Sequence, residues 1–159
     1  MGDLARHRAF ADMIAETWPD RALRVADVAG GHGMLNAELY RRGYRNVVTF
    51  DKRKKRWTER SHYHYGLFSV DAPRGFDLVV GMHPDAGTDQ AIAYAARRRV
   101  PFAVVPCCIY PSAFPYDGPR NYEAWCEHLR LTAKSLDMDV TEEWLSITGR
   151  NIVLVGSPF

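Results

Sequence analysis

A short apolar strand that runs directly into a cluster of glycines constrains the fold of this chain more than any other feature. Residues 25–28 read Val-Ala-Asp-Val, which is typical of a buried parallel strand, and three of the next five residues, 29–33, are glycine. Glycine lets the chain turn sharply, so backbone N–H groups in the turn can approach a ligand closely. A helix over residues 34–42 is expected to follow at once. This order of strand, turn and helix predicts the start of an α/β nucleotide-binding domain.

A second apolar strand, over residues 47–51, ends in Asp51, which lies 18 residues beyond Gly33. In a βαβ unit a carboxylate at about this distance accepts hydrogen bonds from the ribose hydroxyls of a bound nucleotide. The two features in this order indicate a nucleotide-cofactor site more strongly than the glycines alone. The alternative is a glycine-rich turn in some other kind of α/β protein.

The glycine turn does not match the fingerprints for NAD or ATP. Asn36 replaces the third glycine of G-x-G-x-x-G, and no lysine follows Gly33 as a Walker loop requires. Asp27, just before the turn, would repel a pyrophosphate but suits a ligand that carries an amino group and a sulfonium charge. These observations favour S-adenosylmethionine as the cofactor, with S-adenosylhomocysteine as its product.

The motif resembles that of the class I, Rossmann-like S-adenosylmethionine-dependent methyltransferases, in which an acidic residue precedes G-x-G-x-G and another ends the next strand. Here Ala29 stands where that family usually has its first glycine. The resemblance implies a three-layer α/β fold with a mostly parallel seven-stranded sheet, in the order 3-2-1-4-5-7-6, and a C-terminal β-hairpin. The cofactor-binding residues expected from it are Asp27, Ala29, Gly30, Gly31, Gly33, Asp51, Lys52, Asp71 and Met82.

Length and composition fit one methyltransferase domain over residues 1–159. A chain of this length with 47% hydrophobic residues can bury a single core. We expect an N-terminal helix within residues 1–20, a cofactor-binding core over 21–111, and a C-terminal helix and hairpin over 112–159.

The alternation of apolar and polar residues predicts the remaining elements. The expected helices are 4–18, 88–99 with Thr88 as its cap, and 121–136; the expected strands are 66–70 ending at Asp71, 76–81, 101–106, 143–148 and 151–156. The last two strands are predicted to pair as the closing hairpin. Asp71, at the end of the third strand, is then a candidate for the adenine pocket.

Overall charge and cysteine content narrow the possible functions only slightly. The formal net charge of +2 does not mark the whole molecule as a polyanion binder, so affinity for nucleic acid would need local patches. Three cysteines give no disulfide framework, and neither a signal peptide nor a long apolar segment is recognisable. We expect a cytoplasmic protein, or a nuclear one, with no membrane partner.

The fourth and fifth predicted strands are followed by His83-Pro84-Asp85 and by Pro106-Cys107-Cys108. Ligands of doubly wound sheets lie beyond the carboxyl ends of the strands, so both segments should lie near a transferable methyl group. His83 and Asp85 are the candidate catalytic residues, and either could assist removal of a proton from the substrate. The imidazole of His83, with an unperturbed pKa of about 6.5, accepts a proton near neutrality. A histidine that is hydrogen-bonded to a loop carbonyl is an equally plausible reading.

These two segments also resemble a subset of the family that includes the eukaryotic tRNA acceptor-stem ribose methyltransferases. That subset usually carries His-x-Cys-Gly, whereas this chain has residues 83–87, His-Pro-Asp-Ala-Gly. The residues expected to contact substrate here are Cys107, Cys108 and Tyr110.

The cysteines have other readings. Cysteine is among the most often buried residue types, so these side chains can simply pack as small apolar groups beside the cofactor. A nucleophilic role has no independent support. A zinc site with His83 and Cys126 is disfavoured because no C-x-x-C pair is present. Neighbouring side chains in an extended segment would also point to opposite sides, so we predict no metal.

A basic run over residues 52–56 follows Asp51 directly, and Trp57, Tyr63 and Tyr65 come soon after. Such a segment can neutralise phosphates and stack on bases, so Lys54 and Arg56 are candidates for RNA contact. A solvated loop whose aromatic residues cover the edge of the sheet is the alternative.

The sequence therefore favours a methyltransferase that acts on RNA, with a tRNA-like substrate and transfer to oxygen or nitrogen. Two alternatives remain: a methyltransferase of small molecules, and a catalytically silent module that binds the cofactor and serves a partner protein. The sequence leaves the oligomeric state open.

Overall fold

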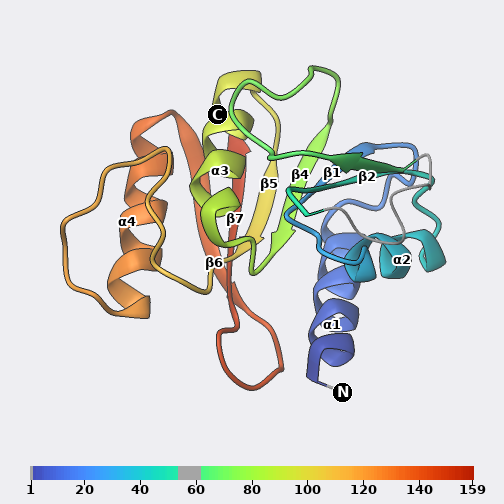
Figure 1. Ribbon diagram of the computed structural model, residues 1–159, viewed down its shortest axis with the longest axis horizontal. Coiled ribbons are helices and arrows are strands. Elements are labelled where there is room, and N and C mark those ends of the chain that lie inside the picture. Colours follow the sequence, from blue (N-terminus) through green and yellow to red (C-terminus); the bar gives the residue numbers. More distant parts are fainter. Residues whose placement is uncertain (1, 54–61) are drawn as a thin grey trace.

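The computed structural model describes residues 2–53 and 62–159, and seven strands within them form one sheet. The strands are β1 (Arg24–Val28), β2 (Asn46–Asp51), β3 (Tyr63–Tyr65), β4 (Leu78–Met82), β5 (Phe102–Val105), β6 (Met138–Trp144) and β7 (Ile152–Pro158). Their order is β3-β2-β1-β4-β5-β7-β6 (Figure 1). β7 pairs antiparallel with β5 and β6, and the other neighbouring strands pair parallel. The predicted fold class, strand order and C-terminal hairpin are confirmed.

Helices cover both faces of the sheet. They are α1 (Gly2–Thr17), α2 (Met34–Arg41), α3 (Thr88–Arg98) and α4 (Tyr122–Ser135), with a 3₁₀ turn, η1 (Asp85–Gly87), before α3. Apolar residues of α1 and α2 pack on one face of the sheet, and those of α3 and α4 pack on the other. Among the residues described, no helix has both the length and the apolar character needed to cross a bilayer.

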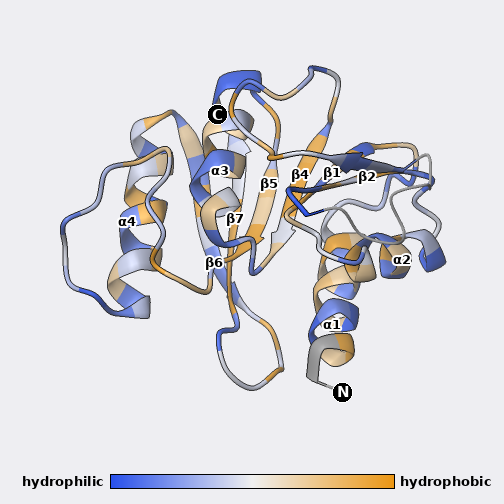
Figure 2. Cartoon of the chain, viewed as in Figure 1, coloured by the Kyte–Doolittle hydropathy of each residue, from blue (hydrophilic) through white to orange (hydrophobic). Residues whose placement is uncertain are grey.

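The central strands are buried on both faces because they lie between these helix layers. Along β4, Val79 belongs to the core under α3 and α4, whereas Leu78 and Val80 belong to the core under α1 and α2. Figure 2 shows β4 and β5 as largely apolar ribbons in the middle of the molecule. Continuous apolar runs of this kind are what the sequence pattern had indicated for parallel strands.

The third strand lies earlier than predicted. β3 pairs with Thr49–Asp51 of β2, and residues 66–70 form a loop instead of the predicted strand. The apolar pattern there reflects Phe68, a loop residue that is 4% exposed and packs edge-on against Phe50 and Tyr94. The prediction that Asp71 ends a strand was therefore wrong.

Two further boundaries needed correction. The penultimate strand was predicted over 143–148, but β6 spans Met138–Trp144 and residues 145–151 connect it to β7. β6 is an edge strand whose polar residues face outward, which hid it in the sequence. Thr88 is the first residue of α3, not its cap: Gly87 occupies the capping position, and no side chain caps the helix there.

Candidate functional site

The glycine loop follows β1 at the carboxyl edge of the sheet. The Gly30 N–H donates to the carbonyl of Phe50 on β2 (3.1 Å), and the Gly33 N–H donates to the Gly30 carbonyl (2.9 Å). Gly31 and Gly33 have φ angles of 55° and 81°, in the left-handed region that favours glycine. The loop is thus a tight turn that follows β1 and is hydrogen-bonded to β2.

Gly30 must be glycine for a second reason. A Cβ at this position would lie 2.2 Å from Oδ2 of Asp27 and 2.6 Å from Cγ2 of Thr49. Both atoms belong to buried side chains, so neither can move aside easily. The backbone of the loop consequently rests directly on the Asp27 carboxylate.

Asp27 is fully buried beneath the loop. Its Oδ2 accepts a hydrogen bond from the Thr49 hydroxyl (2.8 Å), whereas its Oδ1 has no partner among the described residues. Burial raises the pKa of this carboxyl to about 7, with a further upward contribution from the charge of Asp51. The group therefore changes charge close to neutral pH.

Asn36, which replaces the third glycine of the dinucleotide fingerprint, has a structural role. Its side-chain amide donates to the Thr49 hydroxyl (2.9 Å) and to the Val47 carbonyl (3.2 Å). This ties α2 to β2 and places the Thr49 hydroxyl so that it can donate to Asp27.

Asp51 holds the loop from the end of β2. Its Oδ2 accepts from the Gly31 N–H (2.9 Å), and its Oδ1 accepts from the Arg53 N–H (2.8 Å) and Arg53 Nε (3.2 Å). Burial opposes the charge, but these hydrogen bonds outweigh it and lower the pKa of Asp51. A carboxylate has about four acceptor positions, and the described residues use three of those of Asp51, which leaves one for a ligand.

Three non-glycine residues at the same edge have positive φ angles, and two others, Arg99 and Asp137, follow α3 and α4. Ala29, His83 and Asp85 have φ angles of 53°, 50° and 49°, a conformation that costs an L-residue about 1–2 kcal/mol. Ala29 thus has a backbone conformation suited to the glycine that the methyltransferase motif usually carries there. Backbone strain of this kind persists only where the surrounding structure imposes it, and it clusters at functional sites.

His83 follows β4 and contacts the β6–β7 connection. Its Nε2 lies 3.0 Å from the Arg150 carbonyl, which can only accept, so Nε2 carries a proton and Nδ1 is the free acceptor in the neutral ring. Burial lowers the pKa of His83, and the charges of Arg6 and His7 lower it further, against opposing effects from Arg150 and Asp85. His83 is therefore largely neutral at pH 7.

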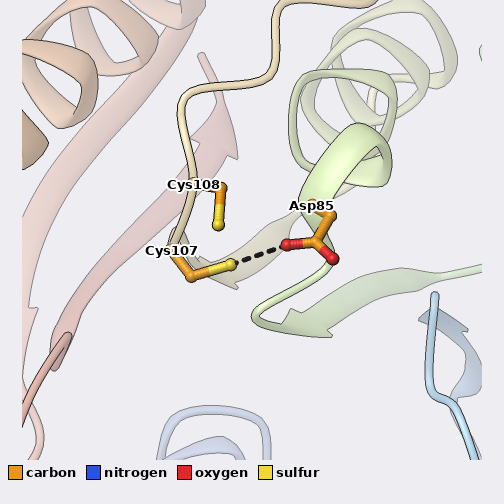
Figure 3. Close-up of side chains that lie close together, drawn as sticks. All are labelled: Asp85, Cys107 and Cys108. Atoms are coloured by element: carbon orange, nitrogen blue, oxygen red, sulfur yellow. Dashed lines mark hydrogen bonds between the residues drawn. The ribbon is translucent and has the colours of Figure 1, made fainter. Parts of the chain in front are cut away.

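Asp85 and the two adjacent cysteines converge from different loops (Figure 3). Ligand atoms of Asp85, Cys107 and Cys108 all lie within 4.8 Å of one another, and the Cys107 thiol donates to Asp85 Oδ1 (2.9 Å). The prediction that the two cysteines point to opposite sides was wrong, because both lie beyond the end of β5 and not in an extended strand. Cys126 lies elsewhere, buried in α4.

The Cys107 thiol is protonated at neutral pH. Its burial, together with the hydrogen bond to the Asp85 carboxylate, raises the pKa to about 12. This removes the thiolate that a nucleophilic role would require.

Sequence reasoning missed Asp89, which organises the loop after β5. The fully buried carboxylate accepts from the backbone N–H groups of Ser112 (2.7 Å), Ala113 (2.8 Å) and Phe114 (3.0 Å). The Ser112 hydroxyl lies 2.7 Å from the Ala86 carbonyl and joins this loop to the one after β4. The sequence signal for Asp89 was an acidic residue in the first turn of a predicted helix. That signal could not reveal its role, because the residues that it binds, 112–114, lie more than 20 positions further along the chain.

The other predicted residues differ in position. Met82 ends β4 and is buried, Lys52 is exposed just after β2, and Tyr110 is exposed in the loop after β5. Asp71 is exposed and pairs with Arg97 of α3 (2.9 Å), outside the contacts that join the glycine loop to Asp51. Lys54 and Arg56 lie outside the described residues.

A cavity of about 930 Å³ opens beside the glycine loop, between α2 and the strands β2 and β3. Its lining includes His32 and Gly33 of the loop, Asn36 of α2, Thr49 of β2 and Tyr63 of β3. The sequence had not indicated this cavity.

Comparison with known proteins establishes the fold. No protein-family model and no curated protein matches the chain. Among solved structures, it resembles the sugar N-methyltransferase KedS8 from Streptoalloteichus (TM-score 0.65, 16% identity, covering 97% of this chain and 87% of that one).

Two further solved structures have the same fold. One is a Burkholderia thailandensis 1,6-didemethyltoxoflavin-N1-methyltransferase with bound S-adenosylhomocysteine (TM-score 0.60, 17% identity, covering 98% of this chain and 78% of that one). The other is a proposed RNA methyltransferase from Pyrococcus horikoshii (TM-score 0.58, 16% identity, covering 95% and 82%). The chain therefore has the methyltransferase fold, and these likenesses leave its substrate open.

We predict that Asp27→Asn changes the pH dependence of stability. The Asp27 carboxyl has a pKa of about 7 in the folded protein and about 3.9 in the unfolded chain. Its contribution to the free energy of unfolding is therefore fully present below pH 4 and is lost as the pH rises through 7. The variant should therefore gain stability relative to the wild type, by up to a few kcal/mol, between pH 5 and pH 8.

Urea unfolding at both pH values measures this difference, with Asp71→Asn as the control at an exposed carboxylate. Parallel pH profiles for wild type and Asp27→Asn would show that Asp27 does not titrate near neutrality.

Proposed function

We propose that this protein is an S-adenosylmethionine-dependent methyltransferase, with residues 1–159 acting as one catalytic domain. The observation that carries the proposal is the glycine loop held between two buried carboxylates, Asp27 beneath it and Asp51 beside it. A relative in fold binds S-adenosylhomocysteine, the product of this cofactor. When bound, the cofactor supplies a methyl group on a positively charged sulfur for direct transfer to a nucleophile.

The residues present fit this cofactor. The unpartnered Oδ1 of Asp27 favours positive charge above the loop, and Asp51 keeps one acceptor position for a ribose hydroxyl. In this proposal the other residues that hold the cofactor are Ala29, Gly30, Gly31, Gly33, Lys52 and Met82.

His83 is the proposed proton acceptor. The Arg150 carbonyl fixes the ring by accepting a hydrogen bond from Nε2–H, so in the neutral imidazole the Nδ1 lone pair is the one that can accept a proton. Asp85, two residues further along the same strained loop, is the second candidate. Holding the nucleophile in line would contribute several kcal/mol more to catalysis.

RNA is the proposed substrate class. Exposed cations lie around the carboxyl edge, among them Lys52 and Arg53 after β2 and Arg150 in the β6–β7 connection. One protein of the same fold is a proposed RNA methyltransferase. Since other proteins of this fold act on a sugar and on a toxoflavin precursor, a small-molecule substrate is the alternative.

We predict that Asp51→Ala weakens binding of S-adenosylmethionine at least about a hundredfold. The substitution removes the ribose acceptor and also releases the Gly31 N–H, so the loop loses the shape that faces the ligand. Isothermal titration calorimetry measures the affinity, with NAD as a second ligand that should not bind.

Asp71→Ala is the matched control, because it removes an exposed carboxylate that pairs with the exposed Arg97 of α3. Binding that is equally strong in wild type and Asp51→Ala would contradict the proposed cofactor site.

We predict that His83→Gln lowers kcat about 10²- to 10⁴-fold and leaves the affinity for S-adenosylmethionine unchanged. The glutamine amide can still donate to the Arg150 carbonyl but has no basic nitrogen. Methyl-transfer rates on the best substrate found measure the effect. An unchanged kcat would reduce His83 to a residue that merely supports the loop.

We predict that RNA binding falls steeply with salt if RNA is the substrate. Each phosphate contact lowers the logarithm of the binding constant by about 0.7–0.9 per tenfold increase in salt. Methyl transfer to total RNA and to a metabolite panel, with filter binding at two salt concentrations, separates the substrate classes. Methyl transfer to a small molecule, at a rate that does not change with salt concentration, would favour the alternative of a small-molecule methyltransferase.

A further inference from the structure

We propose that Asp85, Cys107 and Cys108 form a binding site for Zn²⁺. Figure 3 shows the three side chains reaching toward one another from the loop after β4 and the loop after β5. Their ligand atoms already lie within 4.8 Å of one another. Zn–S bonds of about 2.3 Å and Zn–O bonds of about 2 Å in a tetrahedron place ligand atoms about 3.5–3.8 Å apart. Cys107 Sγ and Asp85 Oδ1, now 2.9 Å apart, would therefore separate slightly to admit the ion, which side-chain rotation can achieve.

The donor set selects the ion. Two thiolates and one carboxylate match Zn²⁺, whereas Mg²⁺ and Ca²⁺ prefer sites made of oxygen alone, and an iron–sulfur cluster needs more cysteines than this site holds. A proton now bridges the Cys107 sulfur and the Asp85 carboxylate, and a metal ion would bind the same two groups in its place. Metal binding would release the thiol protons to solvent.

Both loops are held in place without help from the three ligands. The Asp89 carboxylate binds three backbone N–H groups of residues 112–114, and the Ser112 hydroxyl reaches the Ala86 carbonyl in the other loop. A site whose scaffold is set in advance loses less conformational entropy when it takes up an ion.

The site is also accessible and incomplete. Asp85 and Cys108 are exposed, so an ion can enter from solvent. Three protein ligands leave a fourth tetrahedral position open, as in zinc sites that bind water or substrate. Asp85 lies two residues beyond His83 in the same loop. If the protein transfers methyl groups as proposed above, an ion here would lower the pKa of a substrate hydroxyl bound at this open position. Only this consequence rests on the proposed function; the binding itself does not.

Cobalt substitution tests the proposal without any activity assay. Protein treated with a chelator, with all three thiols shown to be reduced, is titrated with Co²⁺ and followed by absorbance. We expect one equivalent to saturate a thiolate-to-cobalt charge-transfer band, with visible bands typical of tetrahedral geometry, and Zn²⁺ to abolish both. Failure to produce the charge-transfer band with fully reduced protein would overturn the proposal.

The variants decide which residues bind the metal. Cys107→Ser, Cys108→Ser and Asp85→Asn should each weaken Co²⁺ binding at least about tenfold, and the double cysteine variant should lose the band. Cys126→Ala is the matched control, because that cysteine is buried in α4 outside the cluster. A band that persists in the double variant, or disappears in Cys126→Ala while circular dichroism shows native folding, would also overturn the proposal.

Discussion

The candidate site depends on the hydrogen bond from the Gly31 N–H to Asp51, made where the glycine loop lies against Asp27. The hydrogen bond to Asp51 holds the loop against β2, and the packing against Asp27 leaves no space for a side chain at residue 30. The two carboxylates differ in charge state because their surroundings differ. Hydrogen bonds keep Asp51 ionised, whereas Asp27 receives a single one from the residues that the structure describes and titrates near pH 7. The carboxyl edge is thus prepared for a ligand that carries positive charge.

A third buried carboxylate, Asp89, fixes the backbone on the other half of this edge. It fixes residues 112–114 and, through Ser112, joins the loops that follow β4 and β5. These loops carry His83 and the cluster of Asp85, Cys107 and Cys108. The edge therefore has two regions: the glycine loop with Asp27 and Asp51, where we propose the cofactor binds, and the loops after β4 and β5, where we propose proton transfer and metal binding.

The sequence predicted those features that depend on local spacing. The glycine loop, Asp51 and the buried strands β1, β2, β4 and β5 come from continuous apolar runs and short intervals along the chain, and the sheet order came from the family resemblance. The edge strands β3 and β6 were misplaced, since each has polar residues on the side that faces solvent. The role of Asp89 and the convergence of the cysteines depend on loops that approach only in the folded protein, which no local pattern encodes.

The most direct test of this account is a crystal structure of the protein with S-adenosylhomocysteine. The account predicts the ligand at the carboxyl edge, against the backbone of residues 30–33, with a ribose hydroxyl on Asp51. A ligand that touches neither the glycine loop nor Asp51, or a crystal soaked at saturating concentration that contains none, would contradict it.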